Sequence, residues 1–299
     1  MRRVLLLFLL LTQLSANAQM DWWNQIHNWD GATPWTQYMN YSHAYLGPNA
    51  IPLPTLQRSD MGSYFKSSSQ MSLIEDDSFL SLHNELHWDR GHTQIHITHQ
   101  SIEYYRMSEE VRDLRISRDE DGEGVLAGDV LIDISTRLWT KHEQSLWFTF
   151  HTKTAAGPLP QARFTDAPGY AFFFSHQKSF DSWGNWEPYL TTDAGFQVYQ
   201  THWVDYPQND GFLGNIKLQL HKDKTYLSAQ LRTFTGYFLD GDWPRLLELQ
   251  WSQTFTFGPA QLGRAHVGWT RGLNDYPFSF LTVGMTYWLD VHKYSQPKT

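Results

Sequence analysis

Apolar and polar residues alternate with a period of two along most of the chain from Ser78 onward, which is the side-chain pattern of a β-strand. The segment 214–221 reads GNIKLQLH and the segment 227–233 reads LSAQLRT, with a tight turn at 222–224 between them. These alternating segments are about ten to fifteen residues long, whereas ordinary strands have about five or six residues. The pattern therefore predicts long strands that pair as hairpins.

The same alternation recurs in segments 80–88, 130–138, 146–150, 247–257, 265–269 and 281–289, and less regularly in 168–178 and 187–204. It predicts about eleven antiparallel strands, and a further strand near 70–74 would make twelve. Short turns are expected at 89–91 and 258–259, and longer polar connections at 107–125, 156–167 and 179–186. Short turns at one end and longer connections at the other are typical of a transmembrane barrel.

Alternation also fits a secreted β-sandwich or a sugar-binding jelly roll, with one face in the core and one in water. Strand length favours the barrel, because about nine to eleven tilted residues cross an apolar band of roughly 25 Å. Aromatic residues near strand ends are typical of the interfacial girdles of such barrels. The residues predicted for these girdles are Trp139, Trp147, Trp203, Tyr226, Tyr237, Trp243, Tyr287 and Trp288. We expect an all-β fold, an antiparallel transmembrane β-barrel of about 12 strands, and keep the sandwich as an alternative.

The first 18 residues have the features of a cleaved signal peptide. Arg2 and Arg3 precede an apolar run over 4–11, and the segment ends in Ala16-Asn17-Ala18, the small-x-small pattern before a cleavage site. The apolar run is about eight residues, well short of the roughly 20 that a spanning helix needs. We expect cleavage after Ala18 and export of the chain.

Composition narrows the function classes. The 299 residues include no cysteine, which excludes disulfides, zinc-thiolate sites and cysteine nucleophiles. The formal net charge is -8 with no run of four basic residues, so we expect no nucleic-acid partner. The mean hydropathy of -0.50 agrees with strands that place half of their side chains in a wet lumen.

The chain resembles bacterial outer-membrane β-barrel proteins. The features that carry the resemblance are the signal peptide, the strands with period-two alternation and a last amphipathic strand over 279–289. The resemblance implies a cell outer-membrane location, contact with outer-membrane lipid and insertion by the outer-membrane assembly machinery. Many such barrels end in an aromatic residue that this machinery reads, whereas this chain continues past Leu289. We expect the barrel over 67–290 and a polar C-terminal tail over 291–299.

Residues 19–66 form a distinct N-terminal arm that is dense in aromatic and amide side chains, with three prolines over 48–54. Proline removes ladder donors, so this segment is not a central strand. We expect an ordered, irregular arm that packs into or across the lumen. Trp22, Trp23 and Trp29 are candidates for stacking a ligand. The alternative is that residues 19–66 are disordered.

The clearest local cluster of titratable residues is a histidine-rich hairpin. Its candidate residues are His83, Glu85, His87, His92 and His96. A turn around 89–91 predicts that His87 opposes His92 and His83 opposes His96, with Glu85 on the same face. Three interpretations stay open: a polar lumen wall, a metal site for zinc, copper or nickel, and pH gating by the imidazoles.

Further charged residues are predicted to face the lumen, and they carry both signs. They are Asp133, Arg137, Lys217, Arg232, Glu248 and Arg264. Such a mixture favours a side-chain network that narrows the barrel over a strongly ion-selective tube. We therefore expect a narrow porin-like channel, or a binder for a small polar solute, with no cofactor.

Two other functions remain as alternatives. One is a closed structural or assembly barrel that partners another envelope component. The other is a lipid hydrolase, because His176, Ser179 and Asn185 faintly resemble the residues of outer-membrane phospholipases, although their spacing does not match. No phosphate-binding loop, dinucleotide fingerprint or metalloprotease helix is present in the sequence, so catalysis is not expected and no catalytic residue is assigned.

Overall fold

The computed structural model describes residues 62–115, 117, 119–165, 168–200, 208–235, 243–257 and 261–289, together with Gly47 and Asn49. Thirteen strands and one short helix lie in this part of the chain. The strands are β1 (Tyr64–Ser72), β2 (Asp77–Asp89), β3 (Thr93–Met107), β4 (Glu123–Leu126), β5 (Val130–Lys141), β6 (Gln144–Lys153), β7 (Gly169–Ser179), β8 (Glu187–Gln200), β9 (Gln208–Lys222), β10 (Thr225–Phe234), β11 (Arg245–Phe257), β12 (Gln261–Asn274) and β13 (Ser279–Trp288). The helix α2 spans Glu109–Leu114.

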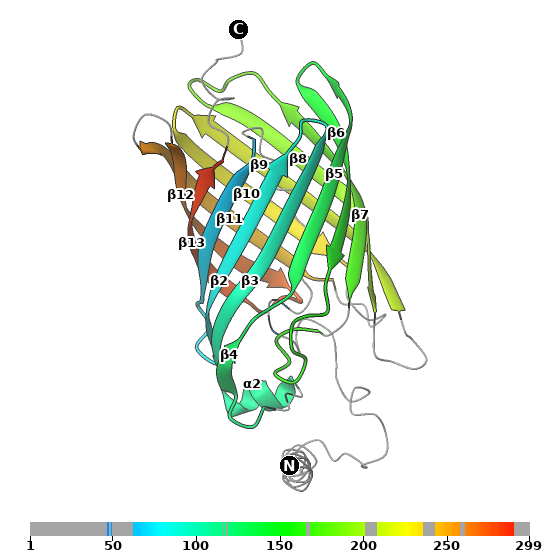
Figure 1. Ribbon diagram of the computed structural model, residues 1–299, viewed down its shortest axis with the longest axis vertical. Helices are drawn as coiled ribbons and strands as arrows, with labels where there is room; N and C mark the ends of the chain where they lie inside the picture. The colour runs from blue at the N-terminus through cyan, green and yellow to red at the C-terminus, as the bar shows by residue number, and fades with distance from the viewer. Residues whose placement is uncertain are drawn as a thin grey trace, which may run out of the picture.

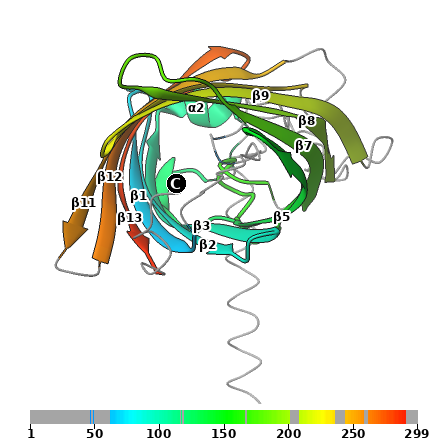
Figure 2. The same cartoon turned by 90° about the horizontal axis from the view of Figure 1, so that it is seen from above.

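Twelve of these strands close into an antiparallel barrel (Figure 1). The first strand makes the closure, because Tyr64 on β1 pairs with His87 on β2 and also with Trp288 on β13. The extra strand β4 pairs only with the end of β3. Viewed along its axis, the barrel is a ring of strands around the interior (Figure 2). The predicted fold class and strand number are confirmed.

The predicted boundaries differ in detail from the observed ones. The strand expected near 70–74 begins at Tyr64, inside the segment assigned to the N-terminal arm. Most of that arm, Trp22, Trp23 and Trp29 included, lies outside the described residues. The last strand, expected over 279–289, is found as Ser279–Trp288.

The connections differ in length between the two ends of the barrel. Five connections lie at what we call the short-turn end: 90–92, 142–143, 180–186, 223–224 and 258–260. The long-connection end carries 73–76, 108–129, 154–168, 201–207, 235–244 and 275–278, with α2 at the bottom of Figure 1. The predicted longer connection at 179–186 was placed wrongly, because β7 and β8 join at the short-turn end.

Apolar side chains cover the outward face of the strands. On β9, Phe212 is 52% exposed and Ile216 is 47% exposed, while the intervening Leu213 and Asn215 are buried inside. Further exposed apolar residues on the strands are Phe65, Leu80, Leu86, Ile134, Phe174, Phe196, Leu249, Trp251, Val267 and Val283. Apolar side chains exposed on strand after strand are what lipid covers in a membrane barrel. No helix in the described part of the chain is long and apolar enough to cross a membrane.

Three residues predicted for the interfacial girdles point inward instead. Trp147 and Trp288 are buried, and Trp288 and Tyr226 line the interior cavity. Alternation along each strand explains this, because Trp288 follows the outward-facing Tyr287, which is 42% exposed. Among the other predicted residues, Trp139, Trp243 and Tyr287 are exposed, whereas Trp203 and Tyr237 lie outside the described residues.

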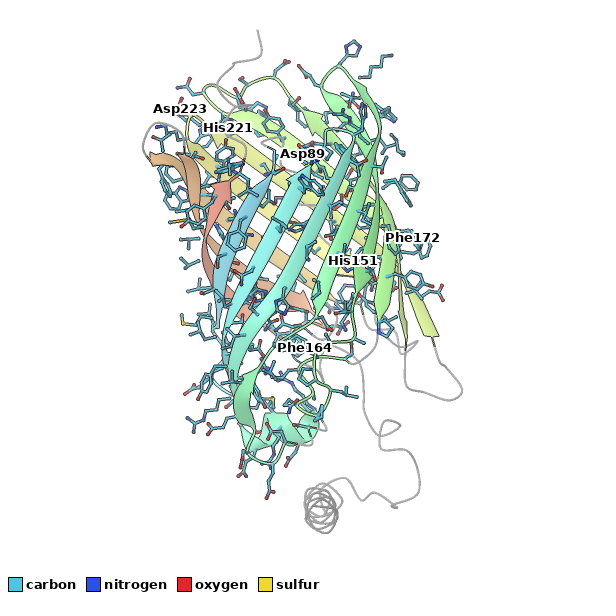
Figure 3. The ribbon with its side chains drawn as sticks, in the orientation of Figure 1. Asp89, His151, Phe164, Phe172, His221 and Asp223 are labelled. Carbon is cyan, nitrogen blue, oxygen red and sulfur yellow. The ribbon has the colours of Figure 1, made fainter. Side chains whose placement is uncertain are left out.

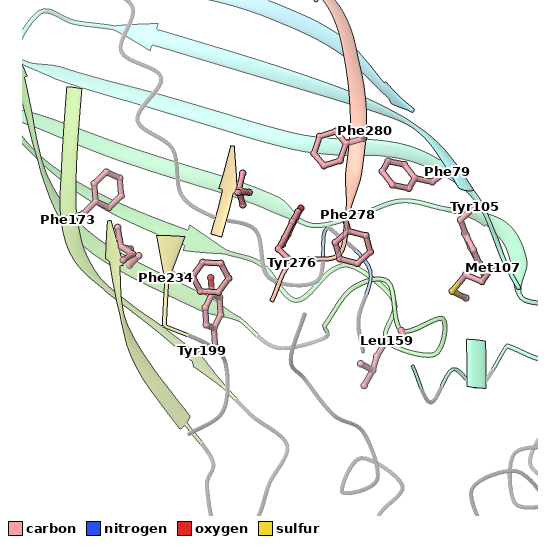
Figure 4. Close-up of a cluster of buried hydrophobic side chains, with 14 of the residues drawn as sticks. Phe79, Tyr105, Met107, Leu159, Phe173, Tyr199, Phe234, Tyr276, Phe278 and Phe280 are labelled. Carbon is pink, nitrogen blue, oxygen red and sulfur yellow. The ribbon is translucent and has the colours of Figure 1, made fainter. Parts of the chain in front are cut away.

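At the long-connection end, a layer of apolar side chains fills the barrel interior (Figure 4). We call this layer the floor. It includes Phe79, Tyr105, Met107, Phe173, Tyr199, Leu213, Phe234, Leu246 and Phe280 from the strands, Tyr276 and Phe278 from the β12–β13 connection, and Leu159 and Ala162 from the β6–β7 connection. The barrel is therefore polar inside over part of its length and has a hydrophobic core at one end.

We predict that a charge on the outward face destabilises the barrel according to its depth. Ile216→Arg lies halfway along β9 and should cost about 2–4 kcal/mol, because arginine at the bilayer midplane loses its hydration. The control, Leu289→Arg, introduces the same charge at an exposed position just after β13 and should cost about 0–1 kcal/mol. Chemical unfolding in phospholipid vesicles measures both. Equal losses would contradict a membrane-embedded outer face.

Candidate functional site

A cavity of about 510 Å³ occupies the barrel interior. Its lining reaches from Leu246 and Phe280, which belong to the floor, to Tyr226 and Trp288 at the short-turn end. Most of the side chains between these limits are polar, because they are the inward half of the alternating strands. The cavity is therefore the place in the described structure where a polar molecule can contact many side chains at once.

One wall of the cavity carries an acid–base ladder across five neighbouring strands, β1, β2, β3, β5 and β6. Lys66 Nζ donates to Glu85 Oε1 at 2.8 Å, and Glu85 Oε2 lies 3.3 Å from His96 Nε2. The other ring nitrogen of His96 is 3.3 Å from Asp133 Oδ2. Asp133 Oδ1 is 2.7 Å from His151 Nδ1. Each carboxylate thus lies between two basic groups, which satisfies its hydrogen-bonding capacity inside the barrel.

The predicted pairing within the histidine hairpin was wrong. His87 opposes His96, and His83 opposes Gln100. The turn is centred later than expected, because the Arg90 N–H donates to the Thr93 carbonyl at 2.9 Å and Gly91 adopts φ +82°. A register shift between Leu82 and His83 moves the pairing further along β3.

The hairpin residues do not converge on one point. His83, Glu85 and His96 line the cavity, whereas His92 is exposed in the turn. His87 is buried and stacks on Tyr64, with ring centroids 4.8 Å apart. Among the residues that the structure describes, no group of three His, Asp or Glu side chains has an arrangement that could hold a metal ion.

The opposite wall, formed by β9 to β12, brings four of the predicted charged residues to the same cavity. Arg232 Nη1 lies 3.6 Å from Glu248 Oε2. The guanidinium of Arg264 lies over the ring of Tyr226 at 3.7 Å and near that of Trp288 at 5.0 Å. Lys217 also lines this wall.

Of the remaining two predicted charged residues, Asp133 belongs to the ladder. Arg137 lies elsewhere, with its guanidinium 5.6 Å from the centre of the Trp147 ring, and it is outside the cavity lining.

The β6–β7 connection is held inside the barrel by a buried group of charges, which we call the latch. Arg163 is fully buried and donates to Asp77 Oδ1 at 2.7 Å and to a carboxylate oxygen of Glu103. Arg115, just after α2, pairs with Asp77 Oδ2 at 2.7 Å. Asn49 donates to Glu103 at 2.8 Å. Burial alone would lower the pKa of Arg163, but Glu103 and Asp77 raise it above the usual value, so the guanidinium stays charged.

A second anchor holds the other side of the same connection. Lys153 pairs with Asp129 Oδ2 at 2.7 Å. Asp129 Oδ1 accepts from the backbone N–H groups of Ala156 and Gly157 at 2.8 and 2.9 Å. These hydrogen bonds fix the point at which the connection enters the barrel. Leu159 lies in the floor, and Phe164, which is labelled in Figure 3, lines the cavity.

The latch was missed by the sequence analysis. Arg115 and Arg163 lie in connections, where no period-two pattern tells which side chains face inward. Glu103 follows the register shift in β3, which moves the inward face from even to odd positions. The local sequence gives one indication that Arg163 is buried, which is its position between the apolar residues Ala162 and Phe164.

The residues considered for lipid hydrolysis do not assemble. His176 Nε2 lies 3.0 Å from Gln144 Oε1, while the Ser179 hydroxyl donates to the Glu143 carbonyl at 3.3 Å. The two side chains are three positions apart on β7 and point to opposite faces of the strand. The described geometry therefore gives Ser179 no histidine base.

No protein-family model and no curated protein matches this chain in sequence. Its structure is similar to that of an outer-membrane channel from Pseudomonas putida F1, with a TM-score of 0.51, 11% identity, and coverage of 79% of this chain and 98% of that one. The fold is that of a bacterial outer-membrane β-barrel. The KdgM porin has a TM-score of 0.44 at 10% identity, covering 76% of this chain and 99% of its own. The β domain of the Bordetella autotransporter BrkA has a TM-score of 0.43 at 13% identity, with the same two coverages.

We predict that Arg163→Ala strongly destabilises the barrel. It leaves Asp77 without one of its two cations and Glu103 without its own, and losing one partner of a buried pair costs about 3–5 kcal/mol. The matched control is Arg106→Ala, because Arg106 is 72% exposed and lies 3.8 Å from Glu123. That exposed pair should contribute about 0–1 kcal/mol. Chemical unfolding in detergent micelles compares the two variants, and equal effects would show that the latch is not stabilising.

Proposed function

We propose that this protein is an outer-membrane barrel that binds a small polar solute in its lumen and passes it across the membrane. The observation that carries the proposal is the polar cavity of about 510 Å³ inside a closed barrel with an apolar outer face. A cavity of this size falls in the range of small-molecule sites, which is about 300–1,000 Å³. The leader over 1–18 supports the outer-membrane location.

The orientation of the barrel in the membrane is proposed from the unequal lengths of the connections at its two ends. Outer-membrane barrels have short turns on the periplasmic side and longer loops outside the cell, so the short-turn end faces the periplasm in this proposal. The floor and the latch then lie on the extracellular side. In this proposal, movement of the β6–β7 connection away from Asp77 and Glu103 lets a solute reach the cavity from outside. The latch is thus proposed as the closed state of a gate.

The N-terminal arm is proposed to restrict the lumen further. Two of its residues support this: the Gly47 N–H donates to the Ala162 carbonyl at 2.8 Å, and Asn49 bonds Glu103. Both contacts join the arm to the latch region. The polar tail over 291–299 is proposed as an extension after the strand that the assembly machinery reads. The last strand itself ends in an aromatic residue, Trp288.

A second candidate is a closed structural barrel that partners another envelope component. The floor favours it, because buried aromatic side chains fill the long-connection end. This candidate predicts that a partner co-purifies with the protein and that no solute crosses the barrel.

Planar-bilayer conductance and swelling of solute-loaded vesicles separate the two candidates. We expect a small single-channel conductance for the wild-type protein and at least a several-fold larger conductance for Arg163→Ala, because the β6–β7 connection loses its anchor. Arg163→Gln serves as a second variant that keeps more of the side-chain packing. The Arg106→Ala control should behave like the wild type.

Each protein is first shown to be folded by its faster gel migration before boiling, since closed barrels resist detergent. Folded wild-type and latch variants that give neither conductance nor swelling would remove the channel function and leave the structural barrel.

A further inference from the structure

We infer that the lumen wall formed by β9 and β10 holds a subsite for a small organic anion, centred on Lys217. This inference rests on the proposed function, because it assumes that a solute enters the cavity. The ligand class is a small carboxylate or a similarly compact organic anion. The inference is carried by the distribution of charge around the cavity.

Four carboxylates line the cavity in the described structure, and each has a basic partner. Glu85 and Asp133 belong to the acid–base ladder, with Lys66, His96 and His151 as their partners. Two further pairs complete the set: Asp129 with Lys153 at 2.7 Å and Glu248 with Arg232 at 3.6 Å. The acidic side chains of the lining are therefore already neutralised by the protein itself.

Lys217 is the exception among the cations. It lines the cavity and is partly exposed to it. Within the described part of the chain, no hydrogen bond or ion pair involves its ammonium group. Lys66 and Arg232 each have a carboxylate, and Arg264 donates to the Thr254 hydroxyl at 3.2 Å. An ammonium inside a protein is costly unless it is paired. A bound anion would supply the missing partner.

The two residues paired directly with Lys217 across the sheet are polar and uncharged, and the charged groups around it include Glu248, Arg232 and Asp193. Thr191 on β8 and Gln230 on β10 occupy the paired positions. Gln230 is 3% exposed and lines the cavity. The amide group of Gln230 can donate to an anion at Lys217, because each side-chain amide carries two donors. A cation with neutral hydrogen-bond donors beside it can bind the carboxylate group of a ligand.

A second cation faces the same cavity from β12. The guanidinium of Arg264 lies against the rings of Tyr226 and Trp288. Two positions along the chain, His266 lines the cavity and is 2% exposed, and its buried Nε2 has no hydrogen-bond partner among the described residues. Gly284 makes room for this ring, since a Cβ on Gly284 would lie 2.6 Å from Nε2. The wall opposite the acid–base ladder thus presents Lys217, Arg264 and neutral polar side chains to the lumen, with its carboxylate Glu248 paired to Arg232.

The test uses three probes with the same four-carbon length: succinate, 1,4-butanediol and putrescine. Each is titrated calorimetrically into the full-length, detergent-solubilised barrel at constant ionic strength. We expect saturable binding of succinate alone. Lys217→Gln should weaken it at least about tenfold, and Lys217→Arg should retain it. The control Lys222→Gln, at the short-turn end of the same strand, should bind succinate like the wild type.

A second measurement begins with the wild-type protein alone. The reversal potential of the wild-type barrel in a potassium chloride gradient should show a preference for the anion. Where Lys217→Gln folds, it should reduce that preference. The inference is overturned if Lys217→Gln binds succinate as tightly as the wild type, or if putrescine binds better than succinate. Passage of neutral solutes without any anion preference would overturn the subsite alone. Absence of all conductance and probe binding would overturn the proposed function as well.

Discussion

The closed ladder of backbone hydrogen bonds is the constraint on which the rest of this structure depends. A bilayer offers no water to unpaired N–H and C=O groups, so a sheet can cross it only when its two edges pair with each other. The pairing of β1 with β13 over nine residue pairs does this here. Once the ring is closed, alternation divides every strand into a side that faces lipid and a side that faces the lumen. The apolar outer band and the polar interior are both consequences of that division.

The polar interior then has to satisfy its own charges, and the structure does so in two different ways. The acid–base ladder places carboxylates between basic groups along neighbouring strands. The latch uses buried pairs to hold a connection inside the barrel. Lys217 has no such partner in the described residues, and this difference leads from structure to ligand. The paired charges hold side chains and the β6–β7 connection in place, and the proposed anion subsite rests on the cation that has no such partner.

The sequence was sufficient for the features that repeat. Period-two alternation predicted the strand number and the lumen side of Glu85, Lys217 and Glu248, because a strand offers only two faces. Alternation gave wrong predictions where one local irregularity shifts the pairing between two strands. The positive φ of Gly91 and the irregularity after Leu82 change which residues face His87 and His83. Arg163 lies in a connection with no period at all, so its burial depends on long-range partners that a sequence pattern does not reveal.

The most direct test of the account is cross-linking at the barrel seam, in a chain that has no native cysteine. Phe65 and Tyr287 face each other across β1 and β13 and are both exposed to the outside. In washed outer membranes, mild oxidation of the Phe65→Cys, Tyr287→Cys double variant should form a disulfide that alters gel migration until it is reduced. The control pair, Phe65→Cys with Val283→Cys, should not cross-link, because it is offset by four residues, roughly 13 Å along the strand. Equal cross-linking of the two pairs, or no cross-link and no protein in the outer membrane, would contradict a closed membrane barrel.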